Sequence, residues 1–96
     1  MKLEWTGFAL ADRDAIFDFI EVDSPRSAVF VDDAVKEQVQ QVLLFPESGR
    51  PGRVIGTREL VVRNLPYVIA YRVSDGVVRI LRVLHTAQQW PDDLPH

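Results

Sequence analysis

The stretch YVIAYRVSDGVVRILRVLH, residues 67–85, decides the fold because it contains two strands and the turn between them. Both arms, 67–73 and 77–85, are rich in the β-branched and aromatic residues that favour strands. Between them stand Asp75 and Gly76, a pair typical of a two-residue hairpin turn, in which both central residues need a positive φ. The stretch therefore predicts an antiparallel hairpin.

A two-residue turn also predicts which side chains share a face of this hairpin. Arg72 lies directly opposite Arg79 in that register, and because opposed like charges are destabilising, we expect their face to be open to solvent. The same face carries Val68, Ala70, Leu81, Val83 and His85. The other face, which should meet the helices, carries Tyr67, Ile69, Tyr71, Val73, Val78, Ile80 and Leu84.

Arg82 does not fit this pattern, since the register places it on the apolar face. A one-residue β-bulge would move it to the other face. Alternatively, its stem packs on the core while its head reaches water or pairs with a helix acid such as Asp18 or Glu21.

Two helices are predicted before the hairpin. Residues 9–22 carry apolar side chains at helical spacing, namely Ile16, Phe17 and Ile20. Ser24 is suited to cap a second helix with Pro25 at its first position, and an apolar stripe then continues until Pro46 ends the helix. Because almost nothing separates the two helices, they should form an antiparallel hairpin.

The remaining segments complete the predicted order. Residues 2–5 read as a short strand, 47–53 as a loop rich in glycine and proline, 54–62 as a strand and 64–66 as a turn. The tail after residue 86 predicts no long element. The expected fold class is α+β: a short N-terminal strand, an antiparallel helical hairpin over one face, and a three-stranded antiparallel meander whose other face is at least partly open.

Composition bounds the class of protein. The 96 residues are expected to form a single domain, 1–96, and a hydrophobic content of 47% is enough to build a core. Without cysteine, and with only two distant histidines, neither a metal site nor a cofactor is expected, and His96 is expected to have no role. No segment resembles a signal peptide or a membrane span, so we expect a cytoplasmic protein.

The charges are unevenly distributed along the chain. Residues 1–49 hold four basic and ten acidic side chains, a net charge of −6, whereas residues 50–96 hold seven basic and four acidic ones, a net charge of +3. Arginine, whose planar fork suits carboxylates and phosphates, supplies every basic residue of the second half: Arg50, Arg53, Arg58, Arg63, Arg72, Arg79 and Arg82. The second half is therefore expected to meet an anionic partner.

Three segments occur in order behind the helical hairpin: FPESGRPGR (45–53), YRV (71–73) and ILRVLH (80–85). Together they resemble the RelE/ParE superfamily of type II toxin–antitoxin toxins, and the resemblance covers essentially the whole chain. It implies a small intracellular toxin, associated with plasmid stabilisation, that a cognate antitoxin neutralises. The antitoxin's C-terminal segment wraps such toxins, and its acidic residues would satisfy the arginines.

The resemblance implies one of two activities. RelE-like members are ribosome-dependent, metal-independent mRNA endoribonucleases that use a cluster of basic residues. In this chain His85 would be the base, and Arg58, Arg72, Arg79 and Arg82 would hold the phosphate. ParE-like members instead bind DNA gyrase and trap its cleavage complex, which requires no catalytic residues.

Charge and sequence favour the ParE-like activity, because a protein that works among ribosomal RNA should be basic and this chain carries a net charge of −3. The segment RVLH also resembles ParE-type sequences more closely. A third alternative is a toxin-fold partner with weak or lost toxicity.

The residues expected to contact the antitoxin or the target are Arg50, Arg53, Arg58, Arg72, Arg79 and Trp90. Trp90 is either an exposed anchor or, as we expect, folded back to cap the core. The chain could form a homodimer or a toxin–antitoxin hetero-oligomer.

Overall fold

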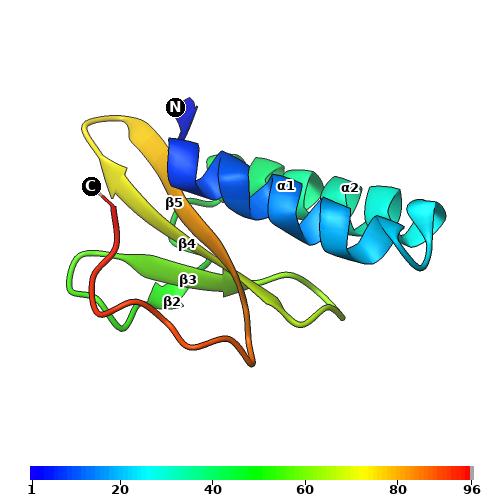
Figure 1. Ribbon diagram of the computed structural model, residues 1–96. Coiled ribbons are helices and arrows are strands. Elements are labelled where there is room, and N and C mark those ends of the chain that lie inside the picture. The colour runs from blue at the N-terminus through cyan, green and yellow to red at the C-terminus, as the bar shows by residue number, and fades with distance from the viewer. Residues whose placement is uncertain (96) are drawn as a thin grey trace.

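Two helices pack on one face of a five-stranded sheet in this computed structural model, which describes residues 1–95 (Figure 1). The elements are β1 (Lys2–Trp5), α1 (Gly7–Glu21), α2 (Pro25–Leu44), β2 (Arg50–Pro51), β3 (Arg58–Val61), β4 (Tyr67–Ser74) and β5 (Val77–His85). The strand order is β1-β5-β4-β3-β2, with β1 parallel to β5 and every other pair antiparallel. His96 lies outside the described residues.

The first helix begins two residues before the predicted segment 9–22. Thr6 is the reason, since its Oγ1 accepts the Ala9 N–H at 3.0 Å and caps the helix N-terminus. The same hydroxyl donates to the Leu81 carbonyl of β5 at 2.9 Å. One side chain therefore starts α1 and fixes its position against the sheet.

The second helix confirms the prediction at both ends. Ser24 caps it by accepting the Ser27 N–H at 3.1 Å, Pro25 is its first residue, and it ends just before Pro46. The two helices lie antiparallel, and the turn that joins them projects beyond the sheet (Figure 1). Neither helix within residues 1–95 is long and apolar enough to cross a membrane.

The main core lies between the helices and the sheet. The inward stripe of α2 and the facing residues of the strands make up most of it: Val31, Val35, Val39, Val42, Val62, Ile69, Tyr71, Val78, Ile80 and Val83. Tyr71 also holds the loop that follows α2, because its Oη donates to the Pro46 carbonyl and accepts the Gly49 N–H, both at 2.8 Å. A Cβ at Gly49 would lie 2.6 Å from that oxygen, so the loop needs glycine there.

The β4–β5 hairpin confirms the predicted turn and the predicted arginine pair. Asp75 and Gly76 have φ values of 52° and 74°, and Arg72 lies opposite Arg79. Beyond Tyr71, which lies opposite Ile80, the register shifts by one residue. A β-bulge was one of the two ways in which Arg82 could be accommodated on β5, and it is present here.

The bulge overturns the predicted faces for the end of β5. Val83 pairs with Ile69 and His85 with Tyr67, so both belong to the helix-facing side and not to the face of Arg72. Leu84 moves to the opposite side, as the partner of Val68. The alternation of side chains is reset because one extra residue stands opposite Ala70.

The prediction of one strand over 54–62 is also wrong. The strand β3 starts only at Arg58, because residues 54–57 make a turn in which the Thr57 N–H donates to the Val54 carbonyl and Gly56 has a φ of 83°. The residues before this turn form β2, which pairs only with the first half of β3. The rest of the outer edge of β3 therefore extends beyond its neighbour.

The C-terminal tail covers part of the face that lies away from the helices (Figure 1). Leu94 is buried there in a second cluster with Ala70 and Leu81, and Val54 packs against them. The face predicted to be partly open is thus divided between this tail and the half-buried arginine pair of the hairpin.

Candidate functional site

The five residues proposed for a nuclease do not form one cluster. Arg72 and Arg79 face each other near the turn of the β4–β5 hairpin, whereas His85 ends β5 six residues after Arg79. At about 3.3 Å per residue, six residues of strand separate the two by about 20 Å. A single phosphate cannot reach both groups.

His85 takes part in local contacts. Its Nδ1 accepts the Ala87 N–H at 3.0 Å, and its own backbone N–H donates to the Gln88 side chain at 3.1 Å. The imidazole also meets the Tyr67 ring edge to face, with centroids 5.3 Å apart. Burial raises the pKa of the Tyr67 phenol above its ordinary value, so this tyrosine stays neutral at physiological pH.

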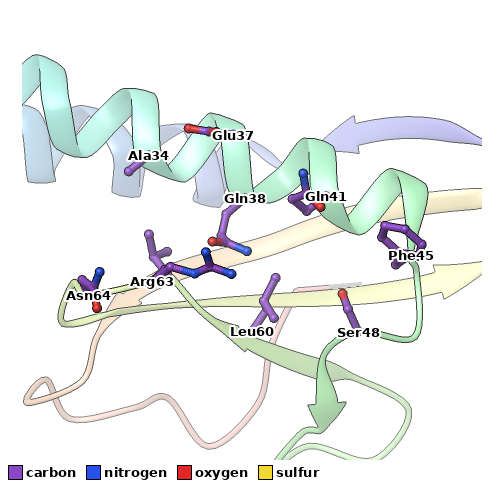
Figure 2. A pocket seen from close by; sticks show the side chains of 10 residues that line it. Ala34, Glu37, Gln38, Gln41, Phe45, Ser48, Leu60, Arg63 and Asn64 are labelled. Carbon is purple, nitrogen blue, oxygen red and sulfur yellow. The ribbon is translucent and has the colours of Figure 1, made fainter.

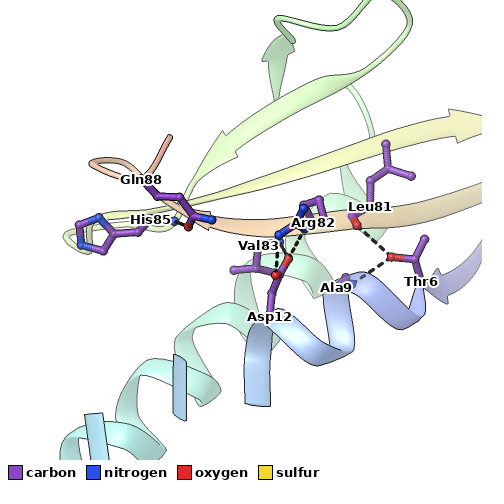
Figure 3. A network of polar contacts seen from close by, with 8 residues as sticks. All are labelled: Thr6, Ala9, Asp12, Leu81, Arg82, Val83, His85 and Gln88. Carbon is purple, nitrogen blue, oxygen red and sulfur yellow. Dashed lines mark hydrogen bonds and ion pairs between the residues drawn. The ribbon is translucent and has the colours of Figure 1, made fainter. Parts of the chain in front are cut away.

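Arg82 is bound to the first helix (Figure 3). Its Nε and Nη2 donate to the two carboxylate oxygens of Asp12 at 2.7 and 2.9 Å, and Asp12 also accepts the Val83 N–H at 2.9 Å. The hydrogen bonding of the Arg82 guanidinium to the Asp12 carboxylate raises the pKa of Arg82. An ion pair with a helix acid was expected, but Asp12 takes the place of the proposed Asp18 or Glu21.

Side chains also occupy the edge of β5 beyond its pairing with β1, which ends at Ile80. The Thr6 hydroxyl donates to the Leu81 carbonyl. The Asp12 carboxylate accepts the Val83 N–H, and the Gln88 side-chain oxygen accepts the His85 N–H (Figure 3). Such capping protects an edge from pairing with another chain.

Arg79 and Arg72 differ in how well they are paired. Arg79 donates twice to Glu4 of β1, at 2.9 and 3.0 Å. Arg72 reaches only the Gly56 carbonyl, at 3.5 Å, and its buried Nε has no hydrogen-bond partner within residues 1–95. Both arginines line a hollow of about 470 Å³ beside the hairpin turn. Arg72 is therefore the better candidate for an external anion.

A buried carboxylate holds the loop arginines, and sequence analysis did not find it. Glu59 has a side chain that is only 2% exposed. It accepts Arg50 Nη2 at 3.2 Å and the Arg53 N–H at 2.8 Å, and the Arg53 guanidinium stacks over the Trp90 ring at 3.6 Å. Trp90 thus folds back, but onto Arg53 of the loop and not onto the core as expected, and its buried Nε1 is unpartnered within residues 1–95.

A groove runs between α2 and the outer edge of β3 (Figure 2). Its volume is about 580 Å³, and its walls combine apolar and polar side chains: Ala34, Glu37, Gln38, Gln41, Phe45, Ser48, Leu60, Val62, Arg63 and Asn64. Sequence analysis did not predict it, because it opens where β2 leaves β3 uncovered.

A second hollow, of about 650 Å³, adjoins the groove at Phe45 and Ser48. It is lined by Met1, Leu44, Phe45, Pro46, Glu47, Ser48, Arg58 and Val73. Arg58 stands in its wall, where its Nη1 donates to the Gly49 carbonyl at 2.8 Å. The groove and the hollow are neighbours that share Phe45 and Ser48, and we call the two together the α2 recess.

No group of three or more potential metal ligands occurs in residues 1–95. The surfaces described above offer a partner guanidinium groups, an unpaired strand edge and apolar side chains.

Comparisons with known proteins agree with this fold. The profile of the family described as "ParE toxin of type II toxin-antitoxin system, parDE" matches residues 3–90. The "Putative toxin Y4kP" of Sinorhizobium fredii is 44% identical over 93 residues, which cover 97% of this chain and 96% of the relative. "Toxin RelE2" of Caulobacter vibrioides is 43% identical over 87 residues, or 91% and 97% of the two chains.

A solved structure, described as "Chromosomal ParDE TA system from P. aeruginosa", superposes with a TM-score of 0.79 at 33% identity, and the match covers 88% of this chain and 95% of the other. The predicted α+β fold and the resemblance to the RelE/ParE superfamily are thereby confirmed. The chain belongs to the ParE toxin family and is the toxin of a type II toxin–antitoxin system, with an antitoxin as its partner.

Proposed function

We propose that this toxin acts by inhibiting DNA gyrase and not by cleaving ribosome-bound mRNA. The observation that carries the proposal is the separation of the nuclease candidates, with His85 about 20 Å along β5 from the Arg72–Arg79 pair. Cleavage through the 2′-hydroxyl needs a base and a phosphate-binding cation at the same phosphate.

The partners of the arginines support the same choice. Arg79 and Arg82 each donate two hydrogen bonds to a carboxylate of the same chain. Arg79 is bound to Glu4 in this way and Arg82 to Asp12. A guanidinium that is already neutralised contributes little to binding a further anion. The net charge of −3 also disfavours a ribosomal RNA surface.

We place the toxin and its targets in the cytoplasm, in a system that stabilises a plasmid or a chromosomal locus.

A paired assay tests the proposal. The purified toxin is incubated with DNA gyrase, ATP and relaxed plasmid, and in parallel with a translation extract programmed with a defined mRNA. We expect loss of supercoiling with trapped cleaved DNA, while the mRNA stays intact. His85→Ala should retain the full gyrase effect, because the imidazole accepts the Ala87 N–H in its own turn and packs against Tyr67.

Cut mRNA together with normal supercoiling would overturn the proposal, and His85→Ala would then be expected to abolish cleavage. Silence in both assays, from a folded protein, would favour the toxin-fold partner with weak or lost toxicity.

The antitoxin is proposed to occupy the α2 recess. Apolar side chains stand exposed along it, Phe45 and Leu44 among them, with Arg63 at one end and Arg58 at the other. The free part of the β3 edge borders the same space, so an extended segment could add its backbone there while acidic residues meet the two arginines.

The other arginines are assigned by position. Arg72 and Arg79 lie on the opposite side of the sheet, and Arg72, which has no carboxylate partner within residues 1–95, is proposed to meet the gyrase target, with the Glu4-paired Arg79 at the border of that contact. Arg50 and Arg53 are held by Glu59, and Arg53 holds Trp90, so these three shape the loop and tail beside that surface.

Two single variants separate the roles of these surfaces. Arg58→Ala is expected to weaken antitoxin binding about tenfold, since one charged hydrogen bond is worth about 1.5 kcal/mol, while leaving the gyrase effect unchanged. Arg72→Ala should weaken the gyrase effect and leave antitoxin binding unchanged. Titration calorimetry with the antitoxin and the supercoiling assay measure the two effects. If neither variant changed either quantity, the assignment of these arginines would be wrong.

A further inference from the structure

The first helix carries a second apolar stripe that the core does not use. The core-facing side of α1 consists of Ala9, Ile16 and Ile20. Elsewhere on the helix and its cap, apolar residues recur at steps of three and four, which places them on one side: Phe8, Ala11, Ala15, Phe19 and Val22. We call this set the α1 stripe.

All five members of the α1 stripe are exposed. Phe8 is 63% exposed, Phe19 80% and Val22 83%. A single exposed apolar residue needs no explanation, but a row of them along almost the whole helix is typical of a docking surface. The two central residues are alanines, which would let a partner helix approach closely between the aromatic side chains.

A row of acids borders the stripe. Asp14, Asp18 and Glu21 are exposed, follow one another at steps of four and three, and make no ion pair within residues 1–95. Asp14 stands three residues after Ala11, and Asp18 three residues after Ala15, so each acid is a surface neighbour of the stripe. The basic residue of α1, Arg13, is bound to Asp32 of α2 and does not neutralise them.

We propose that the α1 stripe docks an amphipathic helix of a partner protein, with basic residues along the flanks of its apolar face. The apolar side chains of that helix pack between Phe8 and Phe19, over the alanines. Its lysines or arginines pair with the free acids. This is helix-to-helix recognition in which the charges set the choice of partner.

A second copy of this chain does not fit the surface as well. A second α1 helix packed parallel would offer the acids no free basic residue, because Arg13 is bound to Asp32. In a helix packed antiparallel about a two-fold axis, the same flank of each helix meets its counterpart. The acid rows would then face each other. Charge complementarity therefore selects a basic partner over self-association.

The surface is distinct from the α2 recess. The recess is bounded by α2 and β3, and none of its lining residues belongs to α1. A helix on the stripe and an antitoxin segment in the recess could bind at the same time. The inference is independent of whether gyrase is the target.

Two synthetic helical peptides test the proposal, each about 18 residues or five turns long. They share one leucine and alanine stripe, and one has lysine flanks whereas the other has glutamate flanks. Fluorescence anisotropy with the purified full chain should show binding of the basic peptide and at least tenfold weaker binding of the acidic one. Raising the salt from about 50 to about 300 mM should weaken the basic peptide's binding, because screening acts on exposed charges.

Matched variants locate the contact. Phe19→Ser should weaken the basic peptide at least tenfold, and Asp18→Asn should weaken it less while reducing its salt dependence. Phe45→Ser is the control, since Phe45 is 63% exposed but lines the α2 recess. It should leave the peptide's affinity unchanged. Unaltered circular dichroism and melting temperature would show that each variant folds.

Other outcomes would overturn the proposal. Equal binding of both peptides would mean that the acids do not select the partner. Loss of binding in Phe45→Ser, with retention in Phe19→Ser, would place the peptide in the α2 recess. A concentration-dependent dimer in analytical ultracentrifugation that Phe19→Ser abolishes would make a second copy the occupant.

Discussion

Replacing Asp12 with alanine is expected to lower the free energy of unfolding by about 3 kcal/mol. The carboxylate accepts three hydrogen bonds, two from the Arg82 guanidinium and one from the Val83 N–H, and both charged side chains are largely buried, at 15% and 21% exposure. Breaking a buried pair by removing one partner costs about 3–5 kcal/mol, because the other charge stays behind uncompensated. Urea unfolding followed by circular dichroism measures the loss.

A double-mutant cycle separates the ion pair from the rest of this effect. Asp12→Asn keeps one acceptor oxygen, which can serve both the Val83 N–H and the Arg82 Nε, so it should cost only about 1–2 kcal/mol. Arg82→Met removes the charge that Asp12→Ala strands, so the double variant should be more stable than the sum of the single losses predicts, by about 1–3 kcal/mol. Additive losses would show that Asp12 acts through the Val83 N–H alone.

The same contacts decide where another chain can join the sheet. Thr6, Asp12 and Gln88 occupy the edge of β5 after β1 ends. At the opposite edge, β2 pairs with Arg58 and Glu59, so within residues 1–95 the end of β3 has no strand on its outer side. The two edges therefore differ, and the antitoxin segment proposed for the α2 recess lies beside the one that is not capped.

Local sequence signals predicted the elements of this fold well. The Asp75–Gly76 turn, the cap at Ser24 and the stop at Pro46 act over a few residues, and each was confirmed in place. The error at 54–62 came from a local turn, whereas the error in the faces of β5 lies beside a long-range contact. Leu81 is the extra residue in β5, and the next residue, Arg82, pairs with Asp12, which lies 70 positions earlier in the chain. Nothing in the strand itself indicates that partner.

The candidate sites show the same division. Composition indicated the arginine-rich half, and periodicity predicted Arg72 opposite Arg79. Neither could show that Glu4 neutralises Arg79 while Arg72 stays unpaired, since that depends on β1 joining the far edge of the sheet. The α2 recess was equally out of reach, because it exists only where the short β2 leaves β3 uncovered.

Replacing Glu59 with alanine is expected to lower the free energy of unfolding by about 2 kcal/mol and to loosen two segments at once. The carboxylate is buried and accepts the Arg53 N–H, so its removal leaves that donor unpaired and opens a cavity. Arg53 then loses the support that places it over Trp90, and the tail loses its hold on the loop. Hydrogen exchange should rise in residues 50–57 and 86–95 and stay unchanged in both helices.

The size of this effect depends on two opposing contributions. Burying the Glu59 charge costs desolvation free energy, and the arginines that compensate it are more than half exposed, at 61% and 53%, so their ion pairs are screened. Arg50→Ala should therefore cost less than 1 kcal/mol, and Glu59→Gln about 1 kcal/mol, since the amide oxygen still accepts the Arg53 N–H. If Glu59→Ala proved as stable as the natural chain while exchange in the tail still rose, desolvation would offset the lost contacts, and the carboxylate would serve to order the loop and tail rather than to stabilise the fold.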